Sequence, residues 1–308
     1  MSNINQYLKA ATRDNTRRSY QSAVTHFEVS WGGFLPATAD SIARYLADHA
    51  NFLTHSTLKQ RMSALAQWHI DQGFPDPTKS PLVKKVLKGI RELHPVQIKQ
   101  ARSLELEQLS AVVDWLDIEL QQSASSANLA LTLKCYRDKA LILIGFWRAF
   151  RSDELCRLSV ENIKVHANKG MTLFLPRTKG DRQSIGQNFK VPALKQLCPV
   201  QAYLDWIDFA QLKDGPVFCG INRWGTLNDK SMHPNSIIPL LRALLKNAAI
   251  VEPETFSSHS LRRGFASWAT ASNWSLKSLM EYVGWKDVKS AMRYIESSSA
   301  FEALKTIK

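Results

Sequence analysis

Cysteine is scarce in this sequence, and no two cysteines stand at the spacing of a metal or redox motif. The chain has four, none in a CxxC pair and none with a nearby histidine that could complete a metal site. We therefore expect reduced, mostly buried thiols and no metal. No cofactor is predicted either, because the sequence contains neither a P-loop nor a cluster of carboxylates of the metal-binding type. The four cysteines are Cys135, Cys156, Cys198 and Cys219.

Long hydrophobic runs are also missing. The longest notable apolar stretch, residues 140–147, is far too short to cross a bilayer, which takes about 20 residues of helix. The first residues (MSNINQYLKAATRDNTRR) lack the apolar centre of a signal peptide. We predict a protein that stays in the cytoplasm and does not contact a membrane.

Acidic residues are too few to balance the basic ones. The chain has 40 Lys and Arg against 27 Asp and Glu, a formal net charge of +13 over 308 residues. With 44% hydrophobic and 22% charged residues, the composition is that of a folded globular protein, and the length allows two domains. The excess positive charge indicates a partner rich in phosphate, such as a nucleic acid.

Helical periodicity covers most of the first hundred residues. A basic amphipathic segment occupies 12–30, and apolar side chains recur at helical spacing over 38–50 and 54–71. Another helix is expected after Ser80, with serine as its cap and Pro81 at its first position, and it carries Lys84, Lys85 and Lys88 beside an apolar face. We predict a small helical domain over 1–93 and a polar, basic linker over 94–103 (HPVQIKQARS).

Residues 104–308 predict a larger, mostly helical domain with one small antiparallel sheet. Helices are expected near 106–122 and 137–149. A strand at 171–176, a polar loop (RTKGDRQS) and a returning strand near 188–192 indicate a β-hairpin. From Cys198 onward the pattern is helical again, apart from an expected Gly/Asn-rich loop at 220–229. The predicted fold class is therefore mainly α.

Two helices of the second domain carry groups suited to a phosphodiester. In FRSDEL, Arg151 precedes a helix that we expect Ser152 to cap, so a phosphate there would meet a guanidinium and the helix N-terminus together. Glu154 is close enough to steady the arginine. In HSLRRGF, His259 and Arg262 are three residues apart on one helix and therefore neighbours on its flank.

Two further places are the hairpin tip and the last predicted helix. Lys179 lies near the tip, where its ammonium could reach into a groove. Trp285 precedes a short helix that starts near Asp287 and carries Tyr294 near its end. A phenol with a pKa of roughly 10 becomes a useful nucleophile only where cations and a base stabilise its phenolate. Taken singly, each feature has an ordinary explanation as a surface cation, a capping histidine or aromatic packing.

In this order, however, the residues resemble the tyrosine recombinase (phage integrase) family. The family pattern is Arg, Lys, His-x-x-Arg, then His or Trp, and Tyr nine residues later. The resemblance extends over nearly the whole chain, because the first domain is similar to the family's core-binding domain. Most members have His where this chain has Trp, which makes it similar to the Cre-like subset. The matching residues are Arg151 with Glu154, Lys179, His259 with Arg262, Trp285 and Tyr294.

The resemblance implies a site-specific DNA recombinase that needs neither metal nor ATP. Tyr294 would attack the scissile phosphate and form a 3′-phosphotyrosine bond, with Lys179 as general acid on the leaving 5′ oxygen. Arg151 and Arg262 would hold the non-bridging oxygens. His259 would assist the phenol proton or donate to the phosphate. The indole at position 285 would add one N–H donor without any proton-transfer role.

The resemblance also implies double-stranded DNA with an inverted-repeat site as the partner, and a homo-oligomer on it, a dimer per site and a tetramer in the synapse. The tail after residues 297–299 carries Phe301, Leu304 and Ile307, and it is expected to dock on a neighbouring protomer rather than on its own domain. The role would be that of an integrase or resolvase of a mobile element, acting on the nucleoid. The basic residues expected to contact DNA are Arg17, Arg18, Lys59, Arg61, Lys84, Lys85, Lys88, Arg177, Arg182 and Arg263.

Two alternatives remain open at this point. Type IB topoisomerases and telomere resolvases share the tyrosine nucleophile, although the short chain and the first domain favour a recombinase. A DNA-binding protein that keeps the fold without cleaving DNA is the alternative from a different functional class. The complete set of residues argues against it.

Overall fold

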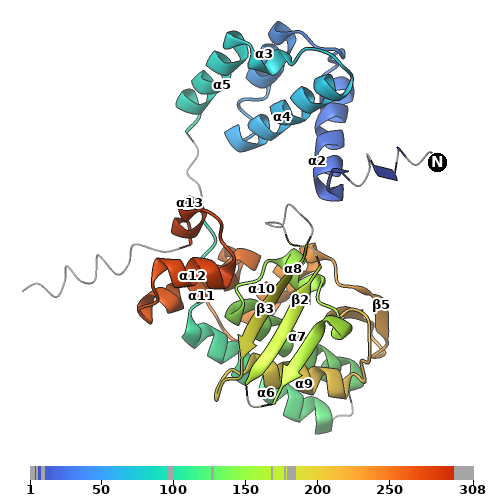
Figure 1. Ribbon diagram of the computed structural model, residues 1–308, viewed down its shortest axis with the longest axis vertical. Coiled ribbons are helices and arrows are strands. Elements are labelled where there is room, and N and C mark those ends of the chain that lie inside the picture. The colour runs from blue at the N-terminus through green and yellow to red at the C-terminus, as the bar shows by residue number, and fades with distance from the viewer. Residues whose placement is uncertain are drawn as a thin grey trace, which may run out of the picture. The chain divides into compact units, whose positions relative to one another are not determined.

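The computed structural model describes residues 4, 6, 7, 11–95, 100–125, 128–167, 169–176, 178 and 185–294. The chain divides into two compact units, 1–99 and 100–308. This division falls inside the segment that we predicted as a linker. Figure 1 shows the elements of each unit.

The first unit is helical, and short polar caps set where its helices begin. Thr38 Oγ1 accepts a hydrogen bond from the Ser41 amide, Thr54 Oγ1 accepts from Thr57, and Ser80 Oγ accepts from Leu82. Pro81 is at the first position of the last helix, as predicted. The elements are α2 (Asp14–Thr25), the π-helical turn η1 (His26–Ser30), α3 (Ala39–Asp48), α4 (His55–Asp71), η2 (Pro77–Lys79) and α5 (Pro81–Leu93).

One hydrophobic core joins these helices. Phe27, Tyr45 and Leu58 are fully buried in it, and α5 contributes Val83 and Ile90. On α5 the lysines at positions 84, 85 and 88 stay exposed, because the apolar residues alone face the core.

The second unit is built around α7, which is buried along most of its length and whose last eight residues, 140–147, are all apolar and buried. A segment that is hydrophobic on all sides requires neighbours all round, and α6, α9 and α11 pack against this helix. The helices are α6 (Leu106–Ser125), α7 (Leu129–Trp147), α8 (Ser152–Cys156), α9 (Pro199–Phe209), α10 (Ile237–Asn247), α11 (Ser258–Ala271), α12 (Leu276–Val283) and α13 (Val288–Met292), with 3-10 turns η3 (Val160–Asn162), η4 (Pro234–Ser236) and η5 (Pro253–Thr255).

The predicted hairpin is present as part of a three-stranded antiparallel sheet. Strands β1 (Ile163–His166), β2 (Gly170–Leu175) and β3 (Gln187–Pro192) lie in the order β1-β2-β3. Leu173 pairs with Phe189 on one side and with Ile163 on the other, so the buried faces coincide.

Our prediction of a loop over residues 220–229 is wrong in part. Residues Cys219–Ile221 (β4) and Leu227–Ser231 (β5) form a second antiparallel hairpin. Only its tip matches the Gly/Asn signal: Asn222 Oδ1 accepts hydrogen bonds from the amides of Trp224 and Thr226. The strands are short and mostly exposed, so their apolar alternation is too weak to predict them.

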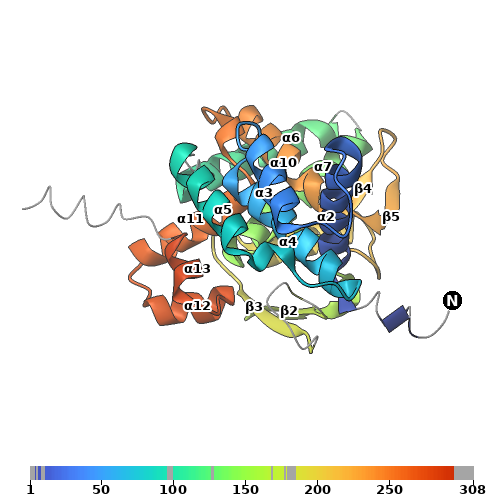
Figure 2. The same ribbon diagram turned by 90° about the horizontal axis from the view of Figure 1, so that it is seen from above.

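A close contact fixes the position of α11 in this unit. The amide of Leu104 donates to the carbonyl of Ser260, and a Cβ on Gly264 would lie 1.9 Å from the Leu104 carbonyl oxygen. Glycine is therefore required where α11 passes this backbone. Figures 1 and 2 both show α11, α12 and α13 on one side of the unit and the β4–β5 hairpin on the other.

Candidate active site

Arg262 of α11 is almost completely buried, with 1% of its surface exposed. Its Nη1 donates to the Ala149 carbonyl oxygen at 2.7 Å and lies 3.8 Å from Oε2 of Glu154. Burial and, to a smaller extent, the nearby Arg151 guanidinium together lower the pKa of Arg262 to about 10. At neutral pH the side chain therefore keeps its charge.

Arg151 stands at the entrance to α8 and is held by a carboxylate of that helix. Glu154 Oε1 accepts from Arg151 Nη1 at 2.8 Å, and its Oε2 accepts from the Arg151 amide at 2.8 Å. The predicted cap by Ser152 is wrong, because the helix begins at Ser152 and the cap position belongs to Arg151. Glu154 thus connects the two arginines, and the Arg151 side chain remains 32% exposed.

Trp285 and Tyr294 form a stacked pair beside the buried arginine. Their ring centroids are 5.1 Å apart at 25°, and the Arg262 Cζ lies 5.1 Å from the indole centroid and 5.7 Å from the phenol centroid. The His259 ring lies nearly parallel to the phenol, at 6.2 Å. Gly284 ends α12 in the left-handed conformation (φ +77°), and the Asp287 side chain caps α13 by accepting from the Ser290 amide.

The indole N–H of Trp285 has no hydrogen-bond partner among the residues that the structure describes. Trp285 is 6% exposed, and within the described residues its Nε1 is buried without a hydrogen bond. An unpaired buried donor is costly, so this one is best explained as a group that awaits an acceptor. A phosphate oxygen is a suitable acceptor.

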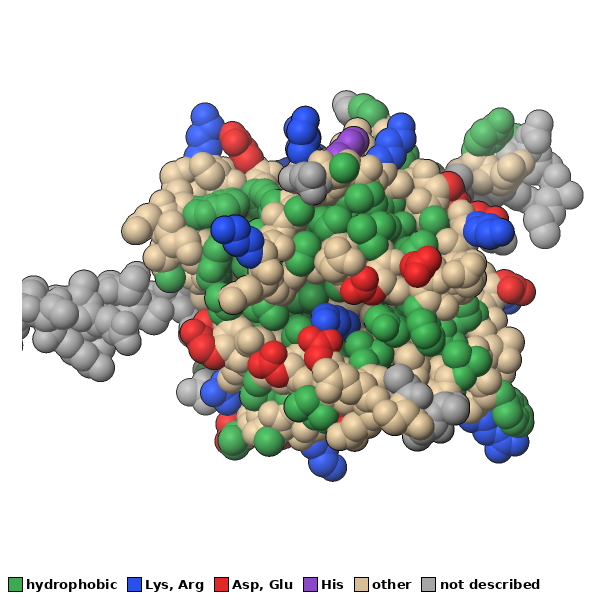
Figure 3. Space-filling model, turned by 90° about the horizontal axis from the view of Figure 1, so that it is seen from below, with side chains coloured by type: hydrophobic (Ala, Val, Ile, Leu, Met, Phe, Trp, Pro, Cys, Tyr) green, Lys and Arg blue, Asp and Glu red, His purple; other side chains and the backbone are tan. Residues whose placement is uncertain are grey.

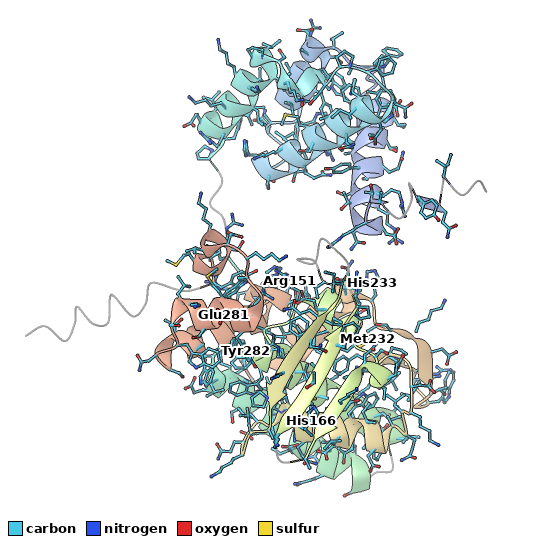
Figure 4. The ribbon with its side chains drawn as sticks, viewed as in Figure 1. Arg151, His166, Met232, His233, Glu281 and Tyr282 are labelled. Carbon is cyan, nitrogen blue, oxygen red and sulfur yellow. The ribbon has the colours of Figure 1, made fainter. Side chains whose placement is uncertain are left out.

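A pocket of about 340 Å³ opens beside Arg151. Arg151 and Glu154 line it from α8, and the segment after α12 lines it with Gly284 and Lys286. The side-chain view in Figure 4 places Arg151 at the same end of the second unit as His233, in agreement with the packing of α8 against η4. The other residues that line the pocket are Thr178, Ile185, Gly186, Gln187, Phe189 and Val283.

A third arginine lies behind this pocket. Arg148 is 4% exposed, and its Nη2 donates to the Tyr282 carbonyl at 2.6 Å. Its guanidinium also lies 4.1 Å from the Tyr282 ring centroid and 4.9 Å from that of Phe189. Burial lowers the pKa of Arg148. Because the Tyr282 hydroxyl donates to the Trp147 carbonyl at 2.8 Å, the end of α7 is connected to α12 at two points.

The structure therefore brings together six of the seven predicted catalytic residues: Arg151, Glu154, His259, Arg262, Trp285 and Tyr294. Lys179 lies outside the described residues, as do two of the predicted DNA contacts, Arg177 and Arg182.

The other predicted DNA contacts differ in exposure. Arg263 is only 7% exposed and donates to the Gln100 side chain and to the Arg293 carbonyl, so little of it can reach a phosphate. Arg61 donates to His26 Nδ1 at 2.8 Å and to the Tyr45 hydroxyl at 3.1 Å. Arg17 is paired with Asp14. The exposed ones are Arg18, Lys59, Lys84, Lys85 and Lys88.

Sequence reasoning missed three residues of this site: Lys286, Gln187 and Arg148. Lys286 had a signal, since it is adjacent to Trp285. Arg148 had one too, since a charged residue directly follows the apolar run of α7. Gln187 had none, because a glutamine at the start of a strand resembles any exposed polar residue.

A second and larger hollow, of about 570 Å³, lies between α6, α7 and α9. Asp114, Asp117 and Asp205 line it, and Lys139 Nζ contacts Asp117 Oδ1 at 2.5 Å. Figure 3, from below, shows acidic side chains around a basic one amid hydrophobic surface on this side. The carboxylates that line this hollow would repel a phosphate, so it is not a phosphate site.

No group of three or more His, Cys, Asp or Glu side chains in the described part of the chain could hold a metal ion. No helix in that part has the length and the apolar character needed to cross a membrane. The cysteines are free, as predicted, and Cys135, Cys156 and Cys219 are buried.

The sequence is similar to curated recombinases over most of its length. It is 29% identical over 305 residues to the "Integrase/recombinase xerD homolog" of Selenomonas ruminantium, covering 96% of this chain and 85% of that one. It is 23% identical over 280 residues to "Recombinase cre" of Escherichia phage P1, covering 86% and 77%.

Solved structures share the fold. A XerH site-specific recombinase bound to palindromic difH substrate matches with a TM-score of 0.59 and 16% identity, over 87% of this chain and 70% of that chain. A Tn1549 transposon integrase in complex with circular intermediate DNA matches with a TM-score of 0.58 and 14% identity, over 96% and 95%.

The sequence pattern of the phage integrase family matches residues 104–300, which include all of the predicted catalytic residues. That match spans more than half of the chain and coincides with the unit that carries the paired arginines and the stacked phenol. The chain therefore belongs to the phage integrase family, the tyrosine recombinases, and is a site-specific DNA recombinase.

Proposed function

We propose that this protein cleaves and rejoins DNA at specific sites through a covalent 3′-phosphotyrosine intermediate on Tyr294. The observation that carries the proposal is the position of that phenol, stacked on Trp285 with the Arg262 guanidinium 5.7 Å from its ring. Charge that builds up on a phosphate at the phenol would meet a cation already fixed in place, which is the most effective form of transition-state stabilisation.

Each step can be assigned to a residue of this chain. Arg151 and Arg262 bind the non-bridging oxygens, and the indole N–H of Trp285, which marks the Cre-like subset, binds one of them too. Lys179 protonates the 5′ oxygen that leaves. His259 accepts or returns the phenol proton. The O–P bond to Tyr294 forms as the O–P bond to the 5′ oxygen breaks, so the number of phosphate ester bonds is conserved and neither ATP nor a metal is required.

The partner that fits is double-stranded DNA with an inverted-repeat site. We propose that the first unit is the core-binding domain and grips the duplex with its exposed cations, among them Lys84, Lys85 and Lys88. Two protomers occupy each site and four form the synapse. The tail with Phe301, Leu304 and Ile307 docks on the neighbouring protomer and couples assembly to cleavage. The enzyme works as the integrase or resolvase of a mobile element, on the nucleoid in the cytoplasm.

The decisive experiment uses a nicked duplex that traps the covalent intermediate. A site is first selected by binding from a random-sequence pool, and the protein is then incubated with the nicked form of that site and analysed on a denaturing gel. The intact protein should form a DNA–protein adduct. Tyr294→Phe should form none and should bind the duplex with unchanged affinity, because it lacks only the hydroxyl.

The outcome also separates the alternatives. If the intact protein binds the site and forms no adduct, it is a DNA-binding protein without cleavage activity, and the proposal is wrong. If it relaxes supercoiled plasmid that lacks the site as fast as plasmid that carries it, a topoisomerase activity replaces site-specific recombination.

A further inference from the structure

Lys286 lies at the mouth of the pocket that contains Arg151. Both side chains line the pocket of about 340 Å³, Arg151 from the start of α8 and Lys286 from the segment between α12 and α13. Two cations thus approach the same space from two separate elements. A dianionic or monoanionic oxygen group of phosphate size is the type of ligand that such a pocket would accept.

The backbone at Lys286 is anchored on both sides. The amides of Gly284 and Trp285 both donate to the Met280 carbonyl at 2.9 Å, and the indole of Trp285 is buried. On the other side, Asp287 accepts from the Ser290 amide at 2.8 Å. The starting point of the lysine side chain is therefore fixed, while the side chain itself is exposed.

The charge of Lys286 is not neutralised within the described residues. No ion pair involves it there. The adjacent Asp287 carboxylate also accepts from the Ser290 hydroxyl, at 2.7 Å. Glu154, the one carboxylate among the described residues that line the pocket, already holds Arg151. The ammonium is therefore available to an external anion.

In the proposed function, Trp285 contributes one donor to the phosphate but no charge. An indole has a single neutral N–H, whereas an ammonium carries a full positive charge and three donors. Building on the proposed function, we propose that Lys286 binds a non-bridging oxygen of the scissile phosphodiester and adds the positive charge that Trp285 cannot supply. It acts as a third cation on the phosphate, beside Arg151 and Arg262, and not as a proton donor.

The test compares Lys286→Ala with Lys289→Ala, a matched control that removes an exposed lysine of α13 that does not line the pocket. Adduct formation is measured in single turnover at saturating DNA, on the nicked duplex and on a duplex with a methylphosphonate at the scissile position. On the ordinary phosphate, Lys286→Ala should react about 100-fold more slowly than the intact protein. Lys289→Ala should react at the full rate, and Lys286→Arg should recover most of the loss.

On the methylphosphonate the non-bridging charge is gone, so Lys286→Ala and the intact protein should react at the same rate. A 5′-thiol leaving group, which needs no acid, should restore Lys179→Ala and leave Lys286→Ala slow. The proposal is overturned if Lys286→Ala cleaves the ordinary duplex normally, if its defect persists on the methylphosphonate, or if the thiol restores it. Absence of an adduct with the intact protein would instead contradict the proposed function itself.

Discussion

At the scale of single residues, the site depends on how one carboxylate is shared. Glu154 accepts from both the side chain and the amide of Arg151 and lies 3.8 Å from Arg262. Arg148 is buried nearby, and it forms no ion pair with a carboxylate of the described residues. Positive charge therefore exceeds negative charge in this interior. Such an excess is unfavourable in the free protein and becomes favourable when a phosphate arrives.

Removing that carboxylate should destabilise the fold. Glu154→Gln keeps the shape and one acceptor but leaves Arg262 without a nearby negative charge, and we expect the free energy of unfolding to fall by about 3 kcal/mol, the usual result of breaking a buried pair. Urea denaturation measures this change. The control is Glu281→Gln, on the exposed surface of α12, which should change stability by less than about 0.5 kcal/mol. Equal stability of both variants would show that Glu154 does not compensate the arginines.

At the scale of elements, α11 carries His259 and Arg262, so its position against Leu104 decides where both point. Gly264→Ala would place a methyl group 1.9 Å from the Leu104 carbonyl oxygen and 2.8 Å from Phe146. The helix must shift, and we expect a loss of about 1–3 kcal/mol of stability together with most of the cleavage activity.

A second glycine provides the control for that change. Gly89 is also inside a helix, α5, and a Cβ there meets nothing within 4 Å. Gly89→Ala should therefore stabilise the protein by about 0.5–1 kcal/mol and leave cleavage unchanged. Thermal unfolding and the adduct assay distinguish the two variants, and a Gly264→Ala protein as active as Gly89→Ala would contradict the role given to the close contact.

Most helices and the main hairpin could be predicted from the sequence, whereas contacts between distant segments could not. The start of the helix after Ser80 followed from its serine cap, the helices at 38–50 and 54–71 from apolar periodicity, and the main hairpin from alternation. The β4–β5 hairpin did not, because its strands are largely exposed and their apolar pattern is interrupted. The order of the catalytic residues was visible in the sequence. What it could not show is that Arg262 is buried under Trp285, or that Arg148 connects α7 to α12, because both facts depend on contacts between distant segments.

At the scale of the whole molecule, the net charge of +13 is the main determinant of how tightly DNA is held. Each phosphate that a cation neutralises releases counterions, so the logarithm of the affinity should fall linearly with the logarithm of salt concentration, with a slope of about −0.9 for each phosphate contacted. Titration of the selected duplex at several salt concentrations gives the slope. Removing Lys84, Lys85 and Lys88 together should make the slope shallower by the equivalent of about three phosphate contacts. An affinity of the intact protein that does not change with salt would show that its basic residues do not contact the phosphates of the duplex.

The indole N–H that no described residue satisfies and the surplus of buried guanidinium groups in the second unit have a practical consequence for anyone who purifies the enzyme. Sulfate or inorganic phosphate in a storage buffer would bind where the substrate phosphate binds, since both offer the same tetrahedral oxygens, and would protect the protein from heat while competing with DNA. Enzyme kept in chloride would be less robust and more active, and activities compared between buffers would reflect the choice of counter-anion as much as the enzyme.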